Sequence, residues 1–224
     1  SDLPMVEWYA ALSLVGQNPG KPMKLVGDLR PVLKAGVGVM DDALEVLSTH
    51  MPTLPTLAKN SYVVFAPGAE YGPAKRWPAK HFAELASKID RPVFLLGSNK
   101  EFDICQEIAT TANAKQPGHC FNLAGQTNLM QAFALIAYAH RVVSNDSGLM
   151  HVAAAFGVPQ VAVFGSSSPE HTPPLNDRAR VVWLRVDPSY QPPLACSPCY
   201  ERNCPLGHTR CLEDVSAERV YRLL

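Results

Sequence analysis

The chain has 224 residues, of which 47% are hydrophobic, and its 20 Lys and Arg residues balance 20 Asp and Glu residues. This composition supports a buried core and excludes a wholly disordered chain, while neutrality without a long basic block argues against nucleic acid as a main partner. No apolar stretch reaches the roughly 20 residues that cross a bilayer. The opening residues also lack the basic region and cleavage site of a secretion signal.

The first part of the chain predicts little regular structure. Residues 5–14 predict a helix that ends at Gly16, and residues 17–60 combine basic and proline-containing stretches with a second helix near residues 41–47. Because the sequence opens almost directly into a helix without an initiator methionine, we expect it to begin inside a longer protein. We therefore predict an interdomain segment over 1–59, with a boundary near Lys59, and one domain over 60–224.

From Ser61 onward the sequence alternates between apolar runs and amphipathic segments. Five runs predict buried strands and a sixth predicts an additional one; they cover residues 62–68, 92–97, 121–125, 141–145, 160–165 and 180–184. Helices are expected between the first five runs, near residues 77–89, 101–111, 127–139 and 148–156, and a last helix begins at 216. Asn128 and Gln131 match a capping box. The fold class is therefore α/β, a Rossmann-like parallel sheet with helices on both faces.

Ligands of such sheets bind beyond the carboxyl ends of the strands, so the turn "SNDSGLMHVAAAFG" at 144–157 is informative. Asp146 and Ser147 are suited to cap the alanine-rich helix, and Gly148 and Leu149 would present free N–H groups to an anion. His151 lies one helical turn further on. The alternative is an ordinary capped helix whose histidine is satisfied in the core.

The loop "PGAEYGPAKRWP" at 67–78 follows the first strand. Gly68 and Gly72 permit close approach of the backbone to a ligand, and Lys75 and Arg76 supply positive charge. The spacing is not that of a Walker A loop, and a surface loop with solvated charges is the alternative. No aspartate lies two positions from another, so we expect Lys75 and helix N–H groups, rather than a metal ion, to neutralise a bound diphosphate.

Three further loops give weaker signals. "GSNKE" at 97–101 is explained by helix capping, whereas Gly125 and Thr127 in "AGQTN" could present backbone groups to a flat ring. "GSSSPEHTPP" at 165–174 serves either a ligand or a change of chain direction.

Together these segments carry a resemblance. "PGAEYGPAKRWP", "LAGQTNLMQAFALIAYA", "SNDSGLMHVAAAFG" and "GSSSPEHTPPL" resemble, in the same order, the C-terminal half of glycosyltransferase family nine enzymes of the ADP-heptose:lipopolysaccharide heptosyltransferase II type. The resemblance implies a glycosyltransferase-B fold. It also implies transfer of L-glycero-D-manno-heptose from ADP-heptose to the lipopolysaccharide inner core, with inversion and without a catalytic cofactor.

The resemblance also assigns residues. It implies that Lys75 contacts the donor phosphates and stabilises the leaving diphosphate. The remaining donor-binding residues that we predict are Gly68, Glu70, Gly125, Thr127, Asp146, Ser147, Gly148, Leu149 and His151. The family's general base lies in a preceding acceptor-binding domain that this sequence does not match, so we expect these 224 residues alone to be inactive. A cytoplasmic location, with peripheral association at the inner membrane, follows from the lipid-anchored acceptor.

Four cysteines cluster at 196–211, with the spacing Cys196-x2-Cys199-x4-Cys204-x6-Cys211. The first pair suits a structural zinc ion, although the later spacings are tighter than those of common zinc ribbons. Reduced thiols, or disulfides formed after purification, are the alternatives.

Two other functions stay open on the sequence. One is a sugar-nucleotide epimerase or hydrolase of the same architecture, which would need acidic or histidine catalysts. The other is a non-catalytic nucleotide-binding module with the cysteine cluster as its interaction site.

Overall fold

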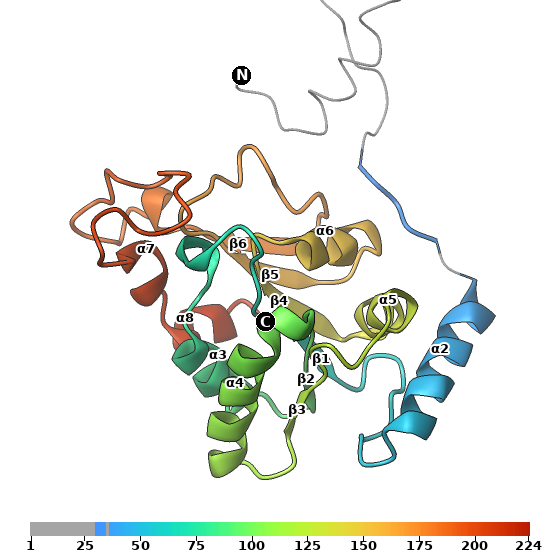
Figure 1. Ribbon diagram of the computed structural model, residues 1–224. Helices are drawn as coiled ribbons and strands as arrows, with labels where there is room; N and C mark the ends of the chain where they lie inside the picture. The colour runs from blue at the N-terminus through green and yellow to red at the C-terminus, as the bar shows by residue number, and fades with distance from the viewer. Residues whose placement is uncertain (1–29, 35) are drawn as a thin grey trace, which may run out of the picture.

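A six-stranded, fully parallel sheet forms the centre of the protein in a computed structural model that describes residues 30–34 and 36–224 (Figure 1). The strands are β1 (Val63–Ala66), β2 (Val93–Leu95), β3 (Cys120–Asn122), β4 (Arg141–Asn145), β5 (Gln160–Val163) and β6 (Ala179–Val182). Their spatial order is β3-β2-β1-β4-β5-β6. The α/β prediction is confirmed, and the parallel pairing follows from strands that are apolar on both faces.

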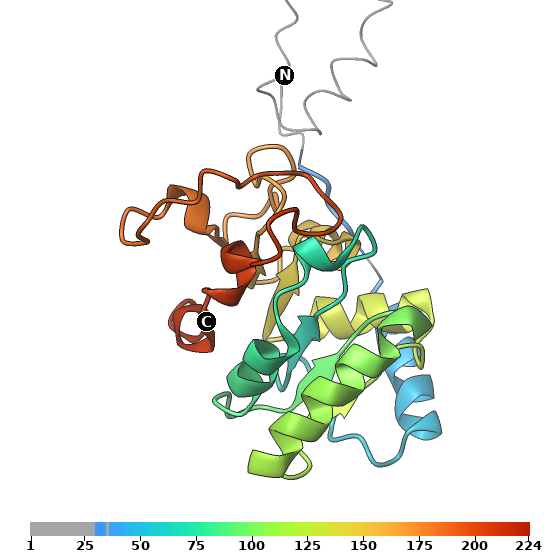
Figure 2. The same ribbon diagram turned by 60° about the vertical axis from the view of Figure 1, so that its left-hand side comes forward.

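Helices cover both faces of this sheet. They are α2 (Val37–His50), α3 (Ala79–Ala86), α4 (Phe102–Lys115), α5 (Leu129–Tyr138), α6 (Gly148–Ala155), α7 (Arg210–Glu213) and α8 (Ala217–Tyr221). Short 3-10 turns add η1 (Pro73–Lys75), η2 (Asn99–Glu101) and η3 (Leu184–Val186). Helices α3, α4 and α8 pack on one face, whereas α2, α5 and α6 pack on the other (Figures 1 and 2).

The alternation of side chains along the strands divides the core in two. In β1, Val63 and Phe65 face the cluster under α3 and α4, while Val64 faces the cluster under α2 and α5. All three side chains are buried, as expected for a central strand in a parallel sheet. The sheet is thus held by two hydrophobic layers.

The segment before β1 is part of this packing. The helix predicted near 41–47 is confirmed as the longer α2, and its Met40, Leu44 and Leu47 are buried in the core shared with α5. Some of the residues assigned to an interdomain segment therefore share a hydrophobic core with the sheet, while the boundary near Lys59 itself stays a prediction. The helix expected over 5–14 lies outside the described residues.

The later elements agree with their predicted places. Asn128 caps α5, and its side chain and that of Gln131 form the expected capping box. The helix expected from Glu101 begins instead at Phe102, because a second capping box, made by Ser98 and Glu101, first closes the turn η2.

The connections reverse direction between β1 and β4. The helices after β1 and β2 lie on the α3 face, whereas those after β3 and β4 lie on the α5 face. The loops leaving β1 and β4 therefore diverge at the carboxyl edge of the sheet and open a crevice between them, which is where doubly wound folds bind their ligands.

Candidate functional site

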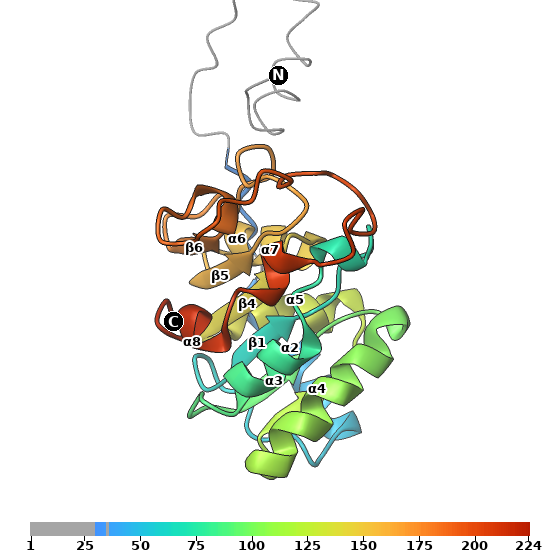
Figure 3. The same ribbon diagram turned by 90° about the vertical axis from the view of Figure 1, so that its left-hand side faces the viewer.

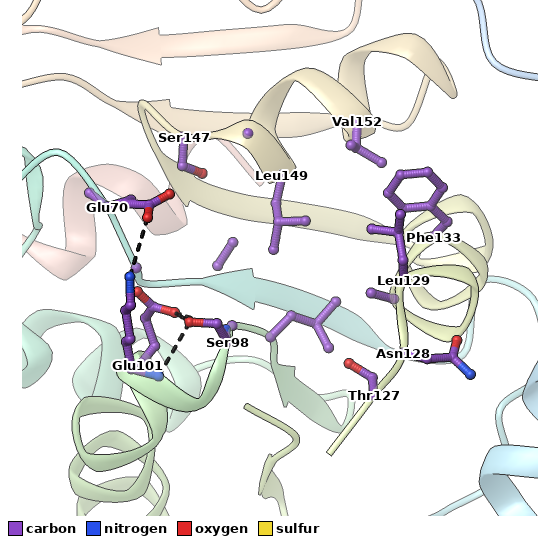
Figure 4. A pocket seen from close by; sticks show the side chains of 18 residues that line it. Glu70, Ser98, Glu101, Thr127, Asn128, Leu129, Phe133, Ser147, Leu149 and Val152 are labelled. Carbon is purple, nitrogen blue, oxygen red and sulfur yellow. Dashed lines mark hydrogen bonds and ion pairs between the residues drawn. The ribbon is translucent and has the colours of Figure 1, made fainter. Parts of the chain in front are cut away.

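A pocket of about 620 Å³ lies at the point where the connections reverse (Figure 4). Segments after β1 and β2 and the starts of α5 and α6 form its walls. Its lining residues are Ala66, Gly68, Ala69, Glu70, Leu96, Gly97, Ser98, Lys100, Glu101, Thr127, Asn128, Leu129, Ala132, Phe133, Ser147, Gly148, Leu149 and Val152. The volume and the mixture of apolar walls with a few polar groups are typical of a small-ligand site.

One end of the pocket is apolar. Leu129 and Phe133 of α5 face Leu149 and Val152 of α6 across it, as Figure 4 shows. Phe133 is fixed by an edge-to-face contact with Phe156, with 6.1 Å between the ring centroids. This end can take a flat aromatic group between aliphatic and aromatic walls, and the predicted Thr127 lies beside it.

The other end of the pocket is polar. Glu70 and Lys100 form an exposed ion pair at 3.3 Å, and Glu101 accepts hydrogen bonds from the backbone and hydroxyl of Ser98 at 2.8 and 2.5 Å. A Cβ on Gly68 would lie 2.6 Å from the Glu101 side chain, so this glycine is required for close contact with the protein itself. Of the two predicted residues here, Glu70 faces the pocket and Gly68 shapes it.

The start of α6 forms the wall between these two ends. Ser147 occupies the N-cap position, but its side chain makes no capping hydrogen bond, and its buried Oγ has no hydrogen-bond partner in the structure. A Cβ on Gly148 would have nothing within 4 Å, so this position faces open space. The first N–H groups of α6 therefore lack the side-chain cap that Asp146 or Ser147 was expected to give, and an anion could satisfy them.

The predicted cation is already paired. Nζ of Lys75 lies 2.6 Å from Oδ2 of Asp146, and these side chains are only 19% and 6% exposed. Nζ also lies 5.3 Å from the ring centroid of Tyr71, and Thr172 donates a 3.4 Å hydrogen bond to the other oxygen of Asp146. Neither Lys75 nor Asp146 lines the large pocket. The structure thus brings the two residues together, with Asp146 next to the N-cap of α6.

Asn145, the last residue of β4, is a structural residue that the sequence analysis missed. It is fully buried, accepts a 2.9 Å hydrogen bond from the backbone of Trp77 and donates to the carbonyls of Pro67 and Gly68 at 2.7 and 3.3 Å. These bonds join the end of β4 to both ends of the loop that carries Lys75. A polar amide at the end of an apolar run was the available signal, because a buried polar group needs partners.

His151 faces a different cavity. Together with His171 and Thr172 it lines a space of about 220 Å³ that shares no lining residue with the large pocket. Partial burial of the ring lowers the pKa of His151; the charge of Asp146 opposes this shift and that of Lys75 adds to it. The histidine is therefore close to the ion pair, but it does not line the pocket that holds Ser147 and Gly148.

Two other predicted glycines contact protein segments. The N–H of Gly125 donates to the carbonyl of Gly97 at 2.9 Å, and the residue does not line the large pocket. Gly125 has a φ of +71°, and a Cβ there would collide with Asn99. A Cβ on Gly72 would lie 2.5 Å from the carbonyl oxygen of Arg202. Both glycines permit close packing between loops, and their predicted approach to a ligand stays a prediction.

The four clustered cysteines are free thiols that line one small cavity away from the large pocket. Burial, together with the neighbouring Cys199, Cys204 and Cys196, raises the pKa of Cys211 to about 11. Within the described part of the chain, no group of three or more His, Cys, Asp or Glu side chains is arranged to hold a metal ion as it stands. Zinc binding therefore stays a prediction. Cys105 and Cys120, by contrast, are buried core residues, as expected.

With this geometry in place, comparison with known proteins identifies the family. The model of the family described as "Glycosyltransferase family 9 (heptosyltransferase)" matches residues 29–209. The chain belongs to glycosyltransferase family 9. Membership agrees with the resemblance carried by the loops at the carboxyl edge of the sheet, since all four quoted segments fall within the matched range.

Curated relatives carry heptosyltransferase names. Lipopolysaccharide heptosyltransferase 2 of Escherichia coli (strain K12) is 54% identical over 123 residues, which are 54% of this chain and 35% of that protein. Lipooligosaccharide heptosyltransferase 2 of Haemophilus influenzae is 40% identical over 184 residues, which are 80% of this chain and 52% of that protein. The matched part of the chain thus spans from a third to about half the length of these relatives.

Solved structures agree with the fold. The structure of E. coli ADP-heptose lps heptosyltransferase II matches 99% of this chain and 60% of that chain, with a TM-score of 0.75 and 36% identity. E. coli heptosyltransferase WaaC with ADP-2-deoxy-2-fluoro heptose shares the fold at a TM-score of 0.52 and 21% identity. In residues 30–34 and 36–224, no helix has the length and apolar character needed to span a bilayer.

Proposed function

We propose that this chain is the donor-binding part of a heptosyltransferase that transfers L-glycero-D-manno-heptose from ADP-heptose to the inner core of lipopolysaccharide. Family membership and the heptosyltransferase 2 names of its relatives support this proposal. The observation that carries it is the pocket at the β1–β4 crevice, whose apolar end suits a nucleobase and whose central wall is the uncapped start of α6.

The pocket suggests how the donor lies. The adenine ring would fit between Leu129 and Phe133 on one side and Leu149 on the other, in the apolar end. The diphosphate would then reach Ser147 and Gly148, where a hydroxyl without a partner and open space meet the first N–H groups of α6. Glu70 and Lys100 lie at the far polar end, near the sugar side of this arrangement.

Loss of ADP from the anomeric carbon builds negative charge on the phosphate oxygens. The N–H groups at the start of α6 and the ammonium of Lys75 would stabilise that charge, and a well-placed donor of this kind is worth about 3 kcal/mol of barrier. Since Lys75 is paired with Asp146 at 2.6 Å, the diphosphate must share or displace that carboxylate. Asp146 would therefore hold the lysine in position until the donor arrives.

The acceptor and the general base are proposed to belong to another part of the complete enzyme. The acceptor is the lipid-anchored inner core, which places the reaction at the cytoplasmic side of the inner membrane through a peripheral contact. A domain preceding the described sheet would supply the base that removes the proton from the acceptor hydroxyl, as the family resemblance implies.

Calorimetry on the 224-residue chain tests the donor assignment. ADP-heptose and ADP should bind at one site per chain, and UDP-glucose should bind more weakly because its pyrimidine fills less of the apolar end. Equal binding of ADP and UDP-glucose, or no binding of either adenine compound, would contradict the proposal. In the same assay, Lys75→Ala removes the proposed phosphate-binding charge. Lys88→Ala is its control, because Lys88 forms a surface ion pair with Glu218 on the α3 face.

A further inference from the structure

Outside the donor pocket, four thiols converge on one small cavity. Cys196, Cys199, Cys204 and Cys211 line a space of about 20 Å³, which is enough for one water-sized particle or ion. The four cysteines are spread over residues 196–211, a segment that is irregular until α7 begins at Arg210. The fold, rather than a single helix or strand, therefore brings them together. All four cysteines are partly buried and none forms a disulfide.

A buried polar group faces the same space without a partner. Ser166 lines the cavity, is 1% exposed, and its Oγ has no hydrogen-bond partner in the structure. A buried hydroxyl without a partner is costly and indicates a missing water or ion. This observation is independent of the cysteine spacing.

The turn around Cys204 holds its sulfur in place through backbone contacts. The backbone N–H of Thr209 donates to Sγ of Cys204 at 3.4 Å, and the N–H of Gly207 donates to its carbonyl at 3.1 Å. Gly207 adopts a φ of +70°, which lets the chain fold back over the sulfur. The backbone of this turn thus fixes the Cys204 sulfur beside the cavity.

We propose that Cys196, Cys199, Cys204 and Cys211 bind one zinc ion. Four thiolates form a closed tetrahedral set that zinc accepts in structural sites, and all four cysteines line the same cavity. Since no group of the described residues is arranged to hold a metal ion without rearrangement, binding requires the four side chains to move together. His208 is left out of this set, because its Nδ1 accepts a 3.1 Å hydrogen bond from the backbone of Arg210. Binding would release the thiol protons that remain at neutral pH, and the proposal stands independently of the proposed function.

The position of this segment gives the ion a structural role. Tyr71 donates a 2.7 Å hydrogen bond to the carbonyl of Tyr200, and the N–H of Ala74 donates at 3.1 Å to the carbonyl of Arg202. Both partners lie between Cys199 and Cys204, so the cysteine segment (196–211) lies against the loop that carries Lys75, as Figures 2 and 3 show. The ion would therefore stabilise the cysteine segment where it contacts the loop that carries Lys75.

Cobalt provides the direct test, because tetrahedral thiolate sites give cobalt(II) intense visible and near-ultraviolet absorption. The 224-residue chain, purified without chelator and reduced under nitrogen, is titrated with cobalt chloride. We expect about one equivalent to produce the thiolate-to-cobalt band and zinc to displace it. Cys204→Ser and Cys211→Ser should lose most of the band, whereas Cys105→Ala, which removes a buried thiol of the core, should keep it.

Two results of the cobalt titration would overturn the zinc site. One is the absence of the charge-transfer band in the reduced wild-type chain. The other is a band that persists in the Cys204→Ser variant, or one that Cys105→Ala weakens as strongly as Cys204→Ser does. Because a cysteine variant could also unfold, melting of the wild-type chain is measured with and without one equivalent of zinc. A rise in the melting temperature supports the site, and an unchanged melting temperature contradicts it.

Discussion

The apolar end of the donor pocket and the Lys75–Asp146 pair both lie close to the start of α6, but only the apolar end is free to receive a ligand. Leu129, Phe133 and Leu149 already enclose a space, so a flat ring can enter with little rearrangement. The cation, by contrast, is engaged by a buried carboxylate at 2.6 Å. The apolar cavity is thus preformed, whereas the Lys75 ammonium is already paired with Asp146. A diphosphate must therefore compete with that carboxylate for the lysine.

The largest loss of ADP affinity is expected from removing the charge of Lys75. Lys75→Ala should lower the affinity for ADP by about thirtyfold, since a hydrogen bond to a charged group is worth about 2 kcal/mol. It also leaves Asp146 buried without its partner, which should cost about 3 kcal/mol of stability. Calorimetry and urea unfolding measure the two effects.

A double variant separates affinity from stability. Lys75→Ala with Asp146→Asn removes the unpaired buried charge, so it should recover most of the lost stability but not the ADP affinity. Recovery of both would mean that the lysine acts through folding alone, and the role assigned to it would be wrong.

The second largest loss of ADP affinity is expected from blocking the start of α6 at Gly148. Gly148→Val places a branched side chain where a Cβ meets no atom within 4 Å, so the fold should tolerate it while the phosphate position is blocked. The affinity for ADP should fall more than about tenfold, or 1.4 kcal/mol. Gly38→Val in α2 is the matched control, because a Cβ there also meets nothing. Equal affinities in the two variants would argue against a phosphate at α6.

The third effect tests the apolar side. Phe133→Ala should reduce the affinity for adenosine and for ADP by the same factor, about fivefold, since a ring contact is worth about 1 kcal/mol. Lys75→Ala, in comparison, should leave adenosine binding unchanged. A loss that is confined to ADP in the Phe133 variant would place the ring of the nucleotide elsewhere.

The smallest effect is a dependence of stability on pH. Burial lowers the pKa of His119 below its ordinary value, with the nearby Asp90 opposing the shift. The unfolded chain therefore binds the proton more readily, so this histidine should lower stability as the pH falls below about 6.5. His119→Gln should flatten that part of the urea midpoint profile without removing it, because the pKa values of His140 and His151 are also lowered. An unchanged profile would contradict this.

Much of the fold was predictable because local signals decide it. Apolar runs marked the strands, and the Asn128–Gln131 capping box marked the start of α5. The parallel sheet then placed the loops at one edge, which is why Ser147 and Gly148 were found near the loop after β1. These features depend on neighbours in the sequence.

The site could be predicted only in part because its interactions are distant in sequence. Lys75 and Asp146 are separated by 71 positions, and their contact follows from the register in which Ala66 pairs with Ser144. The contact between Gly125 and Asn99 could not be predicted either, because it joins the loops after β3 and β2. The wall made by Phe133 and Val152 required the packing of α5 against α6, which no single periodic segment encodes.

The most direct test of the account is a crystal structure of this chain soaked with ADP. The account predicts the adenine between Leu129 and Phe133 on one side and Leu149 on the other, the diphosphate at the first N–H groups of α6, and Nζ of Lys75 drawn from Asp146 toward a phosphate oxygen. A nucleotide bound outside the β1–β4 crevice, or one bound within it while the diphosphate makes no contact with α6 or Lys75, would contradict the account.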